Sequence, residues 1–176
     1  WKEKSKNQEN MDLSCRNGTD LHKWNLTKFK NVVAFDKELS NIEGSKDVKG
    51  ANDSYNEMKN NDSINIRKWA NGSNINFIVG DITKNIFSYD ATRLSGPVYN
   101  KLIRKHINDT TKHTFNSVSY FHGIEKAFSS KENIKNIMAN SKRSLANGGY
   151  LVITCLDGER VFNKLKVSKK LMGLMN

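Results

Sequence analysis

The stretch "MDLSCRNGTDLHKW", residues 11–24, decides the fold. Its apolar start is typical of a short strand, and its middle is typical of a tight turn. Thr19 and Asp20 then stand at an N-cap position, directly before apolar residues at helical spacing. The turn carries Arg16 and Asn17 where a ligand-cradling loop usually has glycine, so the sequence raises the question of whether a binding loop still works here.

Four more apolar runs follow this unit and alternate with amphipathic or polar stretches. They are "NVVAFD" (31–36), "INFIVGD" (75–81), "TFNSVSYF" (114–121) and "GGYLVITC" (148–155). Helices are predicted between and after them, in "NDSYNEMKNN", in "KENIKNIMANSKRSLANGG" with Gly148 as its C-cap, and in "ERVFNKLKVSKKLMGLM". Strands that alternate with helices predict an α/β fold, with a mostly parallel sheet and helices on both faces.

The expected organisation is one domain over residues 10–176, preceded by a fragmentary flank over residues 1–9. The region of about 84–113 is too long for a simple connection, so we expect a surface insertion that is partly helical. Because the chain begins at Trp1 and not at methionine, we expect a fragment or an excised domain.

Composition restricts the classes of function. The chain of 176 residues has a formal charge of +11, which favours an anionic partner. Its lysines and asparagines are scattered, however, and a nucleotide-biased genome would explain them equally well. No signal peptide and no membrane-spanning apolar run is present. Cys15 and Cys155 lie in apolar segments and are expected to be buried free thiols, and no zinc spacing occurs, so no metal is predicted.

Three acidic residues stand at the ends of predicted strands: Asp12, Asp36 and Asp81. Ligands of open α/β sheets bind beyond the carboxyl ends of the strands, where such acids accept hydrogen bonds from ribose and purine groups. Each acid alone is equally well explained as a helix N-cap. The turn lacks the G-x-G-x-x-G spacing, so phosphate-rich nucleotides are disfavoured. A phosphate-free nucleoside such as S-adenosylmethionine fits better.

"DLSCRNGTDLHKW" resembles the D-L-x-C-G-K-G-G-D-L-x-K-W signature of messenger-RNA cap guanine-N7 methyltransferases. The likeness continues in order through "FIVGDITKNI", "FNSVSYFHGIEKAF" and "LANGGYLVITCLDGERVFNKLK", from about residue 10 to 166. It is nearest to the enzymes of large DNA viruses, in which this domain is often the last of a longer capping enzyme. The resemblance implies a Rossmann-like S-adenosylmethionine-dependent methyltransferase fold.

The resemblance also implies the reaction. The sulfonium methyl group of S-adenosylmethionine is placed in line with N7 of the cap guanine, which bears no proton, so no general base is required. The reaction is accelerated by the proximity and orientation of the two reactants and by a favourable electrostatic field. No side chain is therefore expected to be a catalytic residue in the strict sense. Capped mRNA is the implied substrate, with other capping-enzyme domains or a stimulatory subunit as possible partners and no membrane.

The resemblance assigns two sets of site residues. The expected cofactor-binding residues are Ser14, Asp36, Asp81, Phe121 and Lys126. The expected cap-binding residues are Asn17, Asp20, Ser54 and Glu125.

Several of these positions depart from the family pattern. Ser14, Arg16 and Thr19 replace loop glycines, Asn17 replaces a lysine, and Ser54 replaces an arginine. Phe121 replaces a glutamine that contacts the cofactor, and Glu125 and Lys126 replace the His-Tyr pair that holds the guanine. His122 is expected to be a packed or surface histidine, and Trp24 is expected to be a core residue.

Three interpretations therefore stand beside one another. The first is a divergent cap methyltransferase; the second is an inert methyltransferase-like module or decaying fragment with a binding or scaffold role in capping; the third is a basic RNA-binding domain without cofactor. Family members continue past the "DGERVF" helix, so the fold is expected to be truncated at its C-terminus, with an open sheet edge. An intracellular location is expected, in viral factories or the nucleus, with the choice left open.

Overall fold

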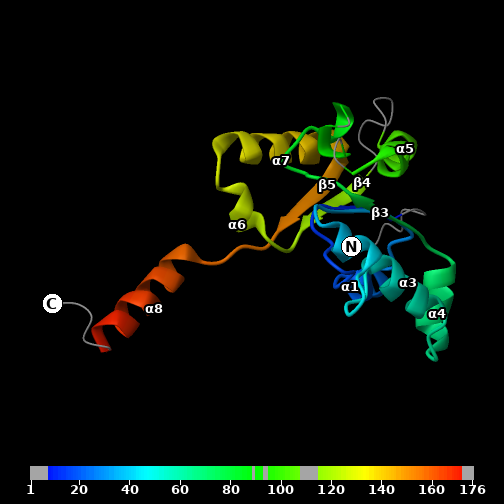
Figure 1. Ribbon diagram of the computed structural model, residues 1–176, viewed down its shortest axis with the longest axis horizontal. Coiled ribbons are helices and arrows are strands. Elements are labelled where there is room, and N and C mark those ends of the chain that lie inside the picture. The colour runs from blue at the N-terminus through cyan, green and yellow to red at the C-terminus, as the bar shows by residue number, and fades with distance from the viewer. Residues whose placement is uncertain (1–7, 89, 93–94, 108–114, 172–176) are drawn as a thin grey trace.

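The computed structural model describes residues 8–88, 90–92, 95–107 and 115–171 (Figure 1). Five strands form one sheet in the order β3-β2-β1-β4-β5, and all neighbouring strands are parallel. The strands are β1 (Glu9–Asp12), β2 (Asn31–Asp36), β3 (Asn74–Val79), β4 (Phe115–Tyr120) and β5 (Leu145–Ile153). The predicted parallel α/β sheet is therefore confirmed.

Helices cover both faces of the sheet. The first half of the chain contributes α1 (Leu21–Thr27), α2 (Leu39–Glu43), α3 (Ala51–Lys59) and α4 (Ile64–Asn71). The second half contributes α5 (Pro97–His106), α6 (Ile124–Ala127), α7 (Lys131–Ser144) and α8 (Gly158–Leu171). Figure 1 shows α1, α3 and α4 on one side of the sheet and α5 and α7 on the other, while α8 stands apart from it.

The region expected to be an insertion contains two short 3-10 helices, Ile86–Ser88 and Asp90–Thr92, in addition to α5. Tyr99 and Ile103 of α5 are buried. Residues 108–113 of that region lie outside the described residues. No helix in the described ranges is both long and apolar enough to cross a bilayer.

The core lies between the sheet and its helices. Val32, Val33, Ala34 and Phe35 of β2 are all buried, because a central parallel strand is covered on both faces. Trp24 is 1% exposed, and its ring centroid lies 6.3 Å from that of Phe77 in β3. The expectation that Trp24 is a core residue is therefore confirmed.

Buried polar side chains of β1 are paired with those of β4. Asn10 is 1% exposed; its amide donates to the Ser119 hydroxyl at 3.2 Å and accepts a hydrogen bond from Ser117 at 2.6 Å. These contacts explain how so short and polar a segment is stable at the centre of the sheet: its polar groups are satisfied by serines more than a hundred residues away in sequence.

The end of α7 differs from the prediction. The helix ends at Ser144, and Gly148 is not its C-cap but lies inside β5, with φ of 78°. The register between β4 and β5 shifts between the pairs Phe115–Leu145 and Ser117–Tyr150. Gly148 therefore lies at an irregularity of the strand, where its positive φ changes the direction of the chain.

Candidate functional site

A cavity of about 820 Å³ opens at the carboxyl ends of the strands. This is the place where the chain order reverses, because β1 lies between β2 and β4 and the connections leave it in opposite directions. Residues predicted to form a binding site line it: Ser14, Asp36, Asp81, Phe121 and Glu125. Arg16, Lys37 and His122 line it too.

Asp36 is the last residue of β2, and its carboxylate is held by three donors. One oxygen accepts the main-chain N–H of Arg16 at 2.9 Å. The other accepts the main-chain N–H of Glu38 and the side-chain amide of Asn41, each at 2.9 Å. A carboxylate offers about four acceptor positions, so this one keeps capacity for a ligand hydroxyl group.

Asp81 follows β3 after Gly80. One oxygen accepts both the main-chain N–H and the hydroxyl of Thr83, at 3.0 and 2.6 Å, and the other lies 3.2 Å from the ammonium group of Lys37. Burial acts to raise the pKa of Asp81, but the hydrogen bonds from Thr83 and the charge of Lys37 outweigh it and leave that pKa lowered. Asp81 is therefore ionised at neutral pH.

Asp12 does not join the other two strand-end acids, and this corrects the expectation of three acids at one ligand. It is fully buried and accepts hydrogen bonds from the Ser14 main-chain N–H at 2.8 Å and the Ser119 hydroxyl at 3.0 Å. Burial raises the pKa of Asp12 to about 7, and the negative charge of Asp20 adds to the effect. Asp12 therefore holds the loop through the main chain of Ser14 and does not line the cavity.

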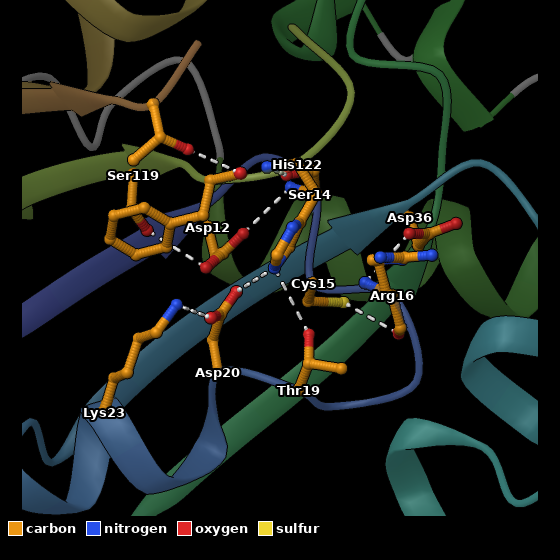
Figure 2. Close-up of polar contacts among 12 residues, drawn as sticks. Asp12, Ser14, Cys15, Arg16, Thr19, Asp20, Lys23, Asp36, Ser119 and His122 are labelled. Atoms are coloured by element: carbon orange, nitrogen blue, oxygen red, sulfur yellow. Dashed lines mark hydrogen bonds and ion pairs between the residues drawn. The ribbon is translucent and has the colours of Figure 1, made fainter. Parts of the chain in front are cut away.

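The loop after β1 has a backbone conformation that is typical of glycine, although one of the residues that adopt it is Arg16. Arg16 has φ of 50° and Gly18 has φ of 84°, both in the left-handed region that favours glycine. The main-chain N–H of Gly18 donates to the carbonyl of Cys15 at 3.0 Å and closes the turn. Figure 2 shows Arg16 beside Asp36. The loop is therefore formed, and a cationic side chain lies at the cavity wall.

The residues expected to bind the cap do not gather in this cavity, apart from Glu125. Ser54 of α3 donates its hydroxyl to the carbonyl of Asn17 at 3.1 Å, so these two lie together outside the cavity lining. Asp20 is the N-cap residue of α1 as predicted, but its side chain makes no capping hydrogen bond and is fully buried. Lys126 belongs to α6, and its side chain lies outside the described part of the structure.

His122, which was expected to be a packed or surface histidine, lies at the cavity wall. Its main-chain N–H donates to the Ser14 hydroxyl at 3.1 Å, and its ring Nε2 lies 3.4 Å from the hydroxyl oxygen of Thr19 (Figure 2). The same nitrogen lies 3.6 Å from Asp20 Oδ2. Its sequence position, two residues beyond the end of β4, was a usable signal, because the carboxyl ends of parallel strands meet at one edge of the sheet.

The charge of the cavity is opposite to that of the chain. Among the described side chains that line it, four are carboxylates and two are permanent cations. The carboxylates are Asp36, Glu38, Asp81 and Glu125, and the cations are Arg16 and Lys37. In a chain of formal charge +11, a cavity with an excess of negative charge favours a cationic ligand over an anionic one.

The two cysteines differ in environment. Cys15 is a buried free thiol, as expected, and burial raises its pKa well above the ordinary value. Cys155 is exposed and lies at the cavity wall, so the expectation that it is buried was wrong. In the described ranges, no three side chains of His, Cys, Asp or Glu come together as a metal site.

Comparisons with known proteins address the family and the fold. A family model described as the mRNA (guanine-N(7))-methyltransferase domain matches residues 1–174. No curated protein sequence matches the chain significantly. Among solved structures, the chain is similar to the crystal structure of PH0226 protein from Pyrococcus horikoshii OT3, with 18% sequence identity and a TM-score of 0.55. The match covers 97% of this chain and 55% of that one, so this chain spans about half the length of that relative.

Proposed function

Because the chain belongs to the mRNA (guanine-N(7))-methyltransferase family, we propose that its cavity binds S-adenosylmethionine and that the domain methylates N7 of the mRNA cap guanine. The observation that carries this proposal is the pair Asp36 and Asp81 at the ends of two neighbouring strands, on one cavity with excess negative charge. The motif resemblance agrees with the family match.

The residues present fit the cofactor. Asp36 keeps acceptor capacity for ribose hydroxyls, and Asp81, ionised at neutral pH, accepts from a purine amino group. The cavity volume of about 820 Å³ lies within the range typical of sites for small molecules and cofactors. The excess of carboxylates favours the positive charge of a sulfonium.

The proposed chemistry asks little of the side chains beyond binding. When bound, the cofactor supplies an electrophilic methyl group on a positively charged sulfur. The chain's own residues hold the nucleoside at the strand ends and orient the reacting groups. No residue has to accept a proton, because N7 of guanine carries none. The residues that bind the cofactor and the guanine are therefore also the residues that accelerate methyl transfer.

A second candidate function is an inert methyltransferase-like module that binds capping proteins or RNA without transferring a methyl group. The observation that favours it is Arg16, whose side chain lies at the cavity wall where the family has glycine. The hydrogen bond between Ser54 and the carbonyl of Asn17 favours it as well, because this bond engages two positions that the family uses near the cap phosphates.

Titration calorimetry with S-adenosylmethionine and with S-adenosylhomocysteine separates the two functions, together with methyl transfer to a capped RNA oligonucleotide. Micromolar binding and N7-methylated product support the enzyme. Binding of neither compound, with no product, supports the inert module. Binding without transfer would place the defect at the cap-binding residues, and a cap-analogue titration would then test Glu125 directly.

A further inference from the structure

Helix α8 extends away from the sheet and leaves its described side chains to solvent (Figure 1). It begins at Gly158, shortly after β5, and the residues that join the two elements include Thr154, Cys155 and Leu156 of the cavity wall. The side chains of residues 159–164 are exposed. α8 is therefore an open surface that starts at the edge of the candidate site.

The charge of α8 is opposite to that of the cavity. Its 14 residues include five basic ones and one acidic one, which gives a formal charge of +4. The basic residues are Arg160, Lys164, Lys166, Lys169 and Lys170. Phosphates supply much of the affinity of proteins for nucleic acids, and carboxylates repel them. The cavity therefore suits a cationic cofactor, while the phosphate chain of a substrate RNA needs a basic surface elsewhere.

Three cations of α8 are available to an anion. Within the ranges that the structure describes, Arg160, Lys164 and Lys166 form no ion pair with a carboxylate. Asp157 and Glu159 lie beside them at the first turn, and Asp157 accepts the main-chain N–H of Arg160 at 3.1 Å. Arg160 and Lys164 are four residues apart, so two like charges share one side of the helix and repel each other. A phosphate bound between them would reduce this repulsion.

Phe162 adds an aromatic surface to these cations. Its side chain is 65% exposed, and Lys166 lies about one helical turn further along on the same face. Proteins that bind single-stranded nucleic acids without sequence preference combine cations for the phosphates with aromatic rings on which bases stack. α8 carries both parts of such a surface within about two helical turns.

We propose that α8 binds the single-stranded RNA that follows the cap, with Arg160, Lys164 and Lys166 at its phosphates and Phe162 stacked on a base. The inference deepens the proposed function, on which it rests for the choice of RNA as the occupant. An anionic membrane would also attract a basic helix. RNA is favoured because the chain belongs to the mRNA (guanine-N(7))-methyltransferase family.

The first test measures binding of an uncapped, single-stranded oligouridylate of about 12 nucleotides by fluorescence anisotropy, without cofactor. In the triple variant Arg160→Gln, Lys164→Gln, Lys166→Gln, the affinity should fall about tenfold or more at low salt. The slope of the logarithm of the affinity against the logarithm of the salt concentration should become less steep by about 2, because each phosphate contact to a single strand contributes about 0.7.

A second triple variant is the matched control. Lys46→Gln, Lys68→Gln and Lys135→Gln remove the same number of charges at exposed positions outside α8 and outside the cavity lining. This control should lower the affinity by less than about threefold, because its lysines do not contact the RNA.

Phe162→Ala tests the stacking contact separately and remains informative if the α8 triple variant does not fold, as judged by thermal unfolding. Its affinity for the oligouridylate should fall about fivefold or more, with an unchanged salt slope, because a base loses its stacking partner while the cations stay.

Methyl transfer then separates this inference from the proposed function. The α8 triple variant should raise KM for a capped RNA oligonucleotide and leave kcat/KM for a cap dinucleotide, which has no RNA body, unaltered. If S-adenosylmethionine does not bind but the oligouridylate binds through α8, the proposed function fails and the RNA surface stands.

Three outcomes would overturn the inference. The first is no binding of the oligouridylate to the unmodified chain. The second is an equal loss of affinity in the two triple variants, which would assign RNA binding to the total charge of the chain. The third is RNA binding that the α8 variants do not change. If those variants then lose binding to vesicles of phosphatidylcholine and phosphatidylserine, α8 is a membrane-binding helix instead.

Discussion

The main-chain N–H of Arg16 donates a 2.9 Å hydrogen bond to the carboxylate of Asp36, which ties the loop after β1 to the end of β2. Arg16 holds φ of 50° while it does so, a left-handed conformation that costs a residue with a side chain roughly 1–2 kcal/mol. Because the bond uses only the main chain of Arg16, any other residue at this position except proline keeps it.

Replacing Arg16 by glycine should therefore stabilise the fold and open the cavity. We expect Arg16→Gly to raise the free energy of unfolding by about 0.5–1 kcal/mol, since the relief of strain exceeds the added flexibility of the unfolded chain. The variant should also bind S-adenosylmethionine more tightly, because a bulky cation leaves the cavity wall. Urea unfolding measures the first effect and titration calorimetry the second.

Lys28→Gly is the matched control. Among the described residues, Lys28 is the other non-glycine residue with positive φ, at 60°, and it ends α1 outside the cavity lining. It should show a similar gain in stability and no change in affinity. If Arg16→Gly binds the cofactor no better than the unmodified chain, its side chain is not the obstruction.

Asp36→Asn should weaken S-adenosylmethionine binding about tenfold or more. The change keeps the size of the side chain but removes its charge, and hydrogen bonds to a charged group contribute about 1.5–3 kcal/mol. Asp62→Asn makes the same chemical change at an exposed position outside the cavity lining and should leave the affinity unaltered. A loss of less than about threefold at Asp36 would contradict its ribose-binding role.

Asp12→Asn should change how stability depends on pH. The pKa of Asp12 is raised from an ordinary value near 4 to about 7 in the folded state. The group therefore favours folding while protonated, and this contribution is lost as the pH rises from about 4 through about 7. Relative to the variant, the unmodified chain should lose on the order of a few kcal/mol across that window. Urea midpoints measured against pH test this, and parallel curves for the two proteins would contradict it.

Asn140→Leu should destabilise the loop that follows Asp81. Asn140 is 2% exposed in α7, and its amide donates to the carbonyls of Ile82 and Lys84 at 3.0 and 2.8 Å. Its oxygen accepts the main-chain N–H of Ile86 at 3.3 Å. Leaving each of these three groups without a partner costs at least about 1 kcal/mol, so we expect a total loss of about 3 kcal/mol or more in urea unfolding.

Asn136→Leu provides the graded control for that prediction. Asn136 lies one turn earlier on α7, is partly buried, and donates one hydrogen bond to the carbonyl of Thr83 at 2.8 Å. Its replacement should cost about 1 kcal/mol. Equal losses in the two variants would show that the three bonds of Asn140 do not act together.

Much of the fold is predictable from the sequence because short runs of apolar residues identify the buried strands. The run that became β2 is apolar and buried from Val32 to Phe35 and ends in an acid, as expected for a parallel strand covered on both faces. The run that became β3 contains two asparagines, but its second half, Phe77 to Val79, is apolar and buried. β1 is harder to recognise, since Asn10 is stable only through the serines of β4. No local pattern reveals a partner that is brought close by the sheet order.

The candidate site was predictable in outline but not residue by residue. Asp36 and Asp81 were found because strand-end acids share one edge of a sheet, and they do line one cavity. Asp12 also stands at the end of a strand. However, the main-chain N–H of Ser14 in the following loop donates to its carboxylate, and Asp12 is buried away from the cavity. His122 was expected to be a packed or surface histidine, and it is a partly exposed residue at the cavity wall. No local sequence pattern places its ring beside Asp20, which is about a hundred residues away in the chain.

The hydrogen bond between the Ser14 hydroxyl and the His122 main chain joins residues 108 positions apart. Closing a chain of that length costs roughly 4 kcal/mol of entropy by its logarithmic term alone. During synthesis, therefore, a chain that has emerged only through β3 holds Asp36 and Asp81 but lacks the far wall of the cavity. A ligand of this cavity, such as the cofactor proposed above, would therefore stabilise the domain only after β4 has docked beside β1.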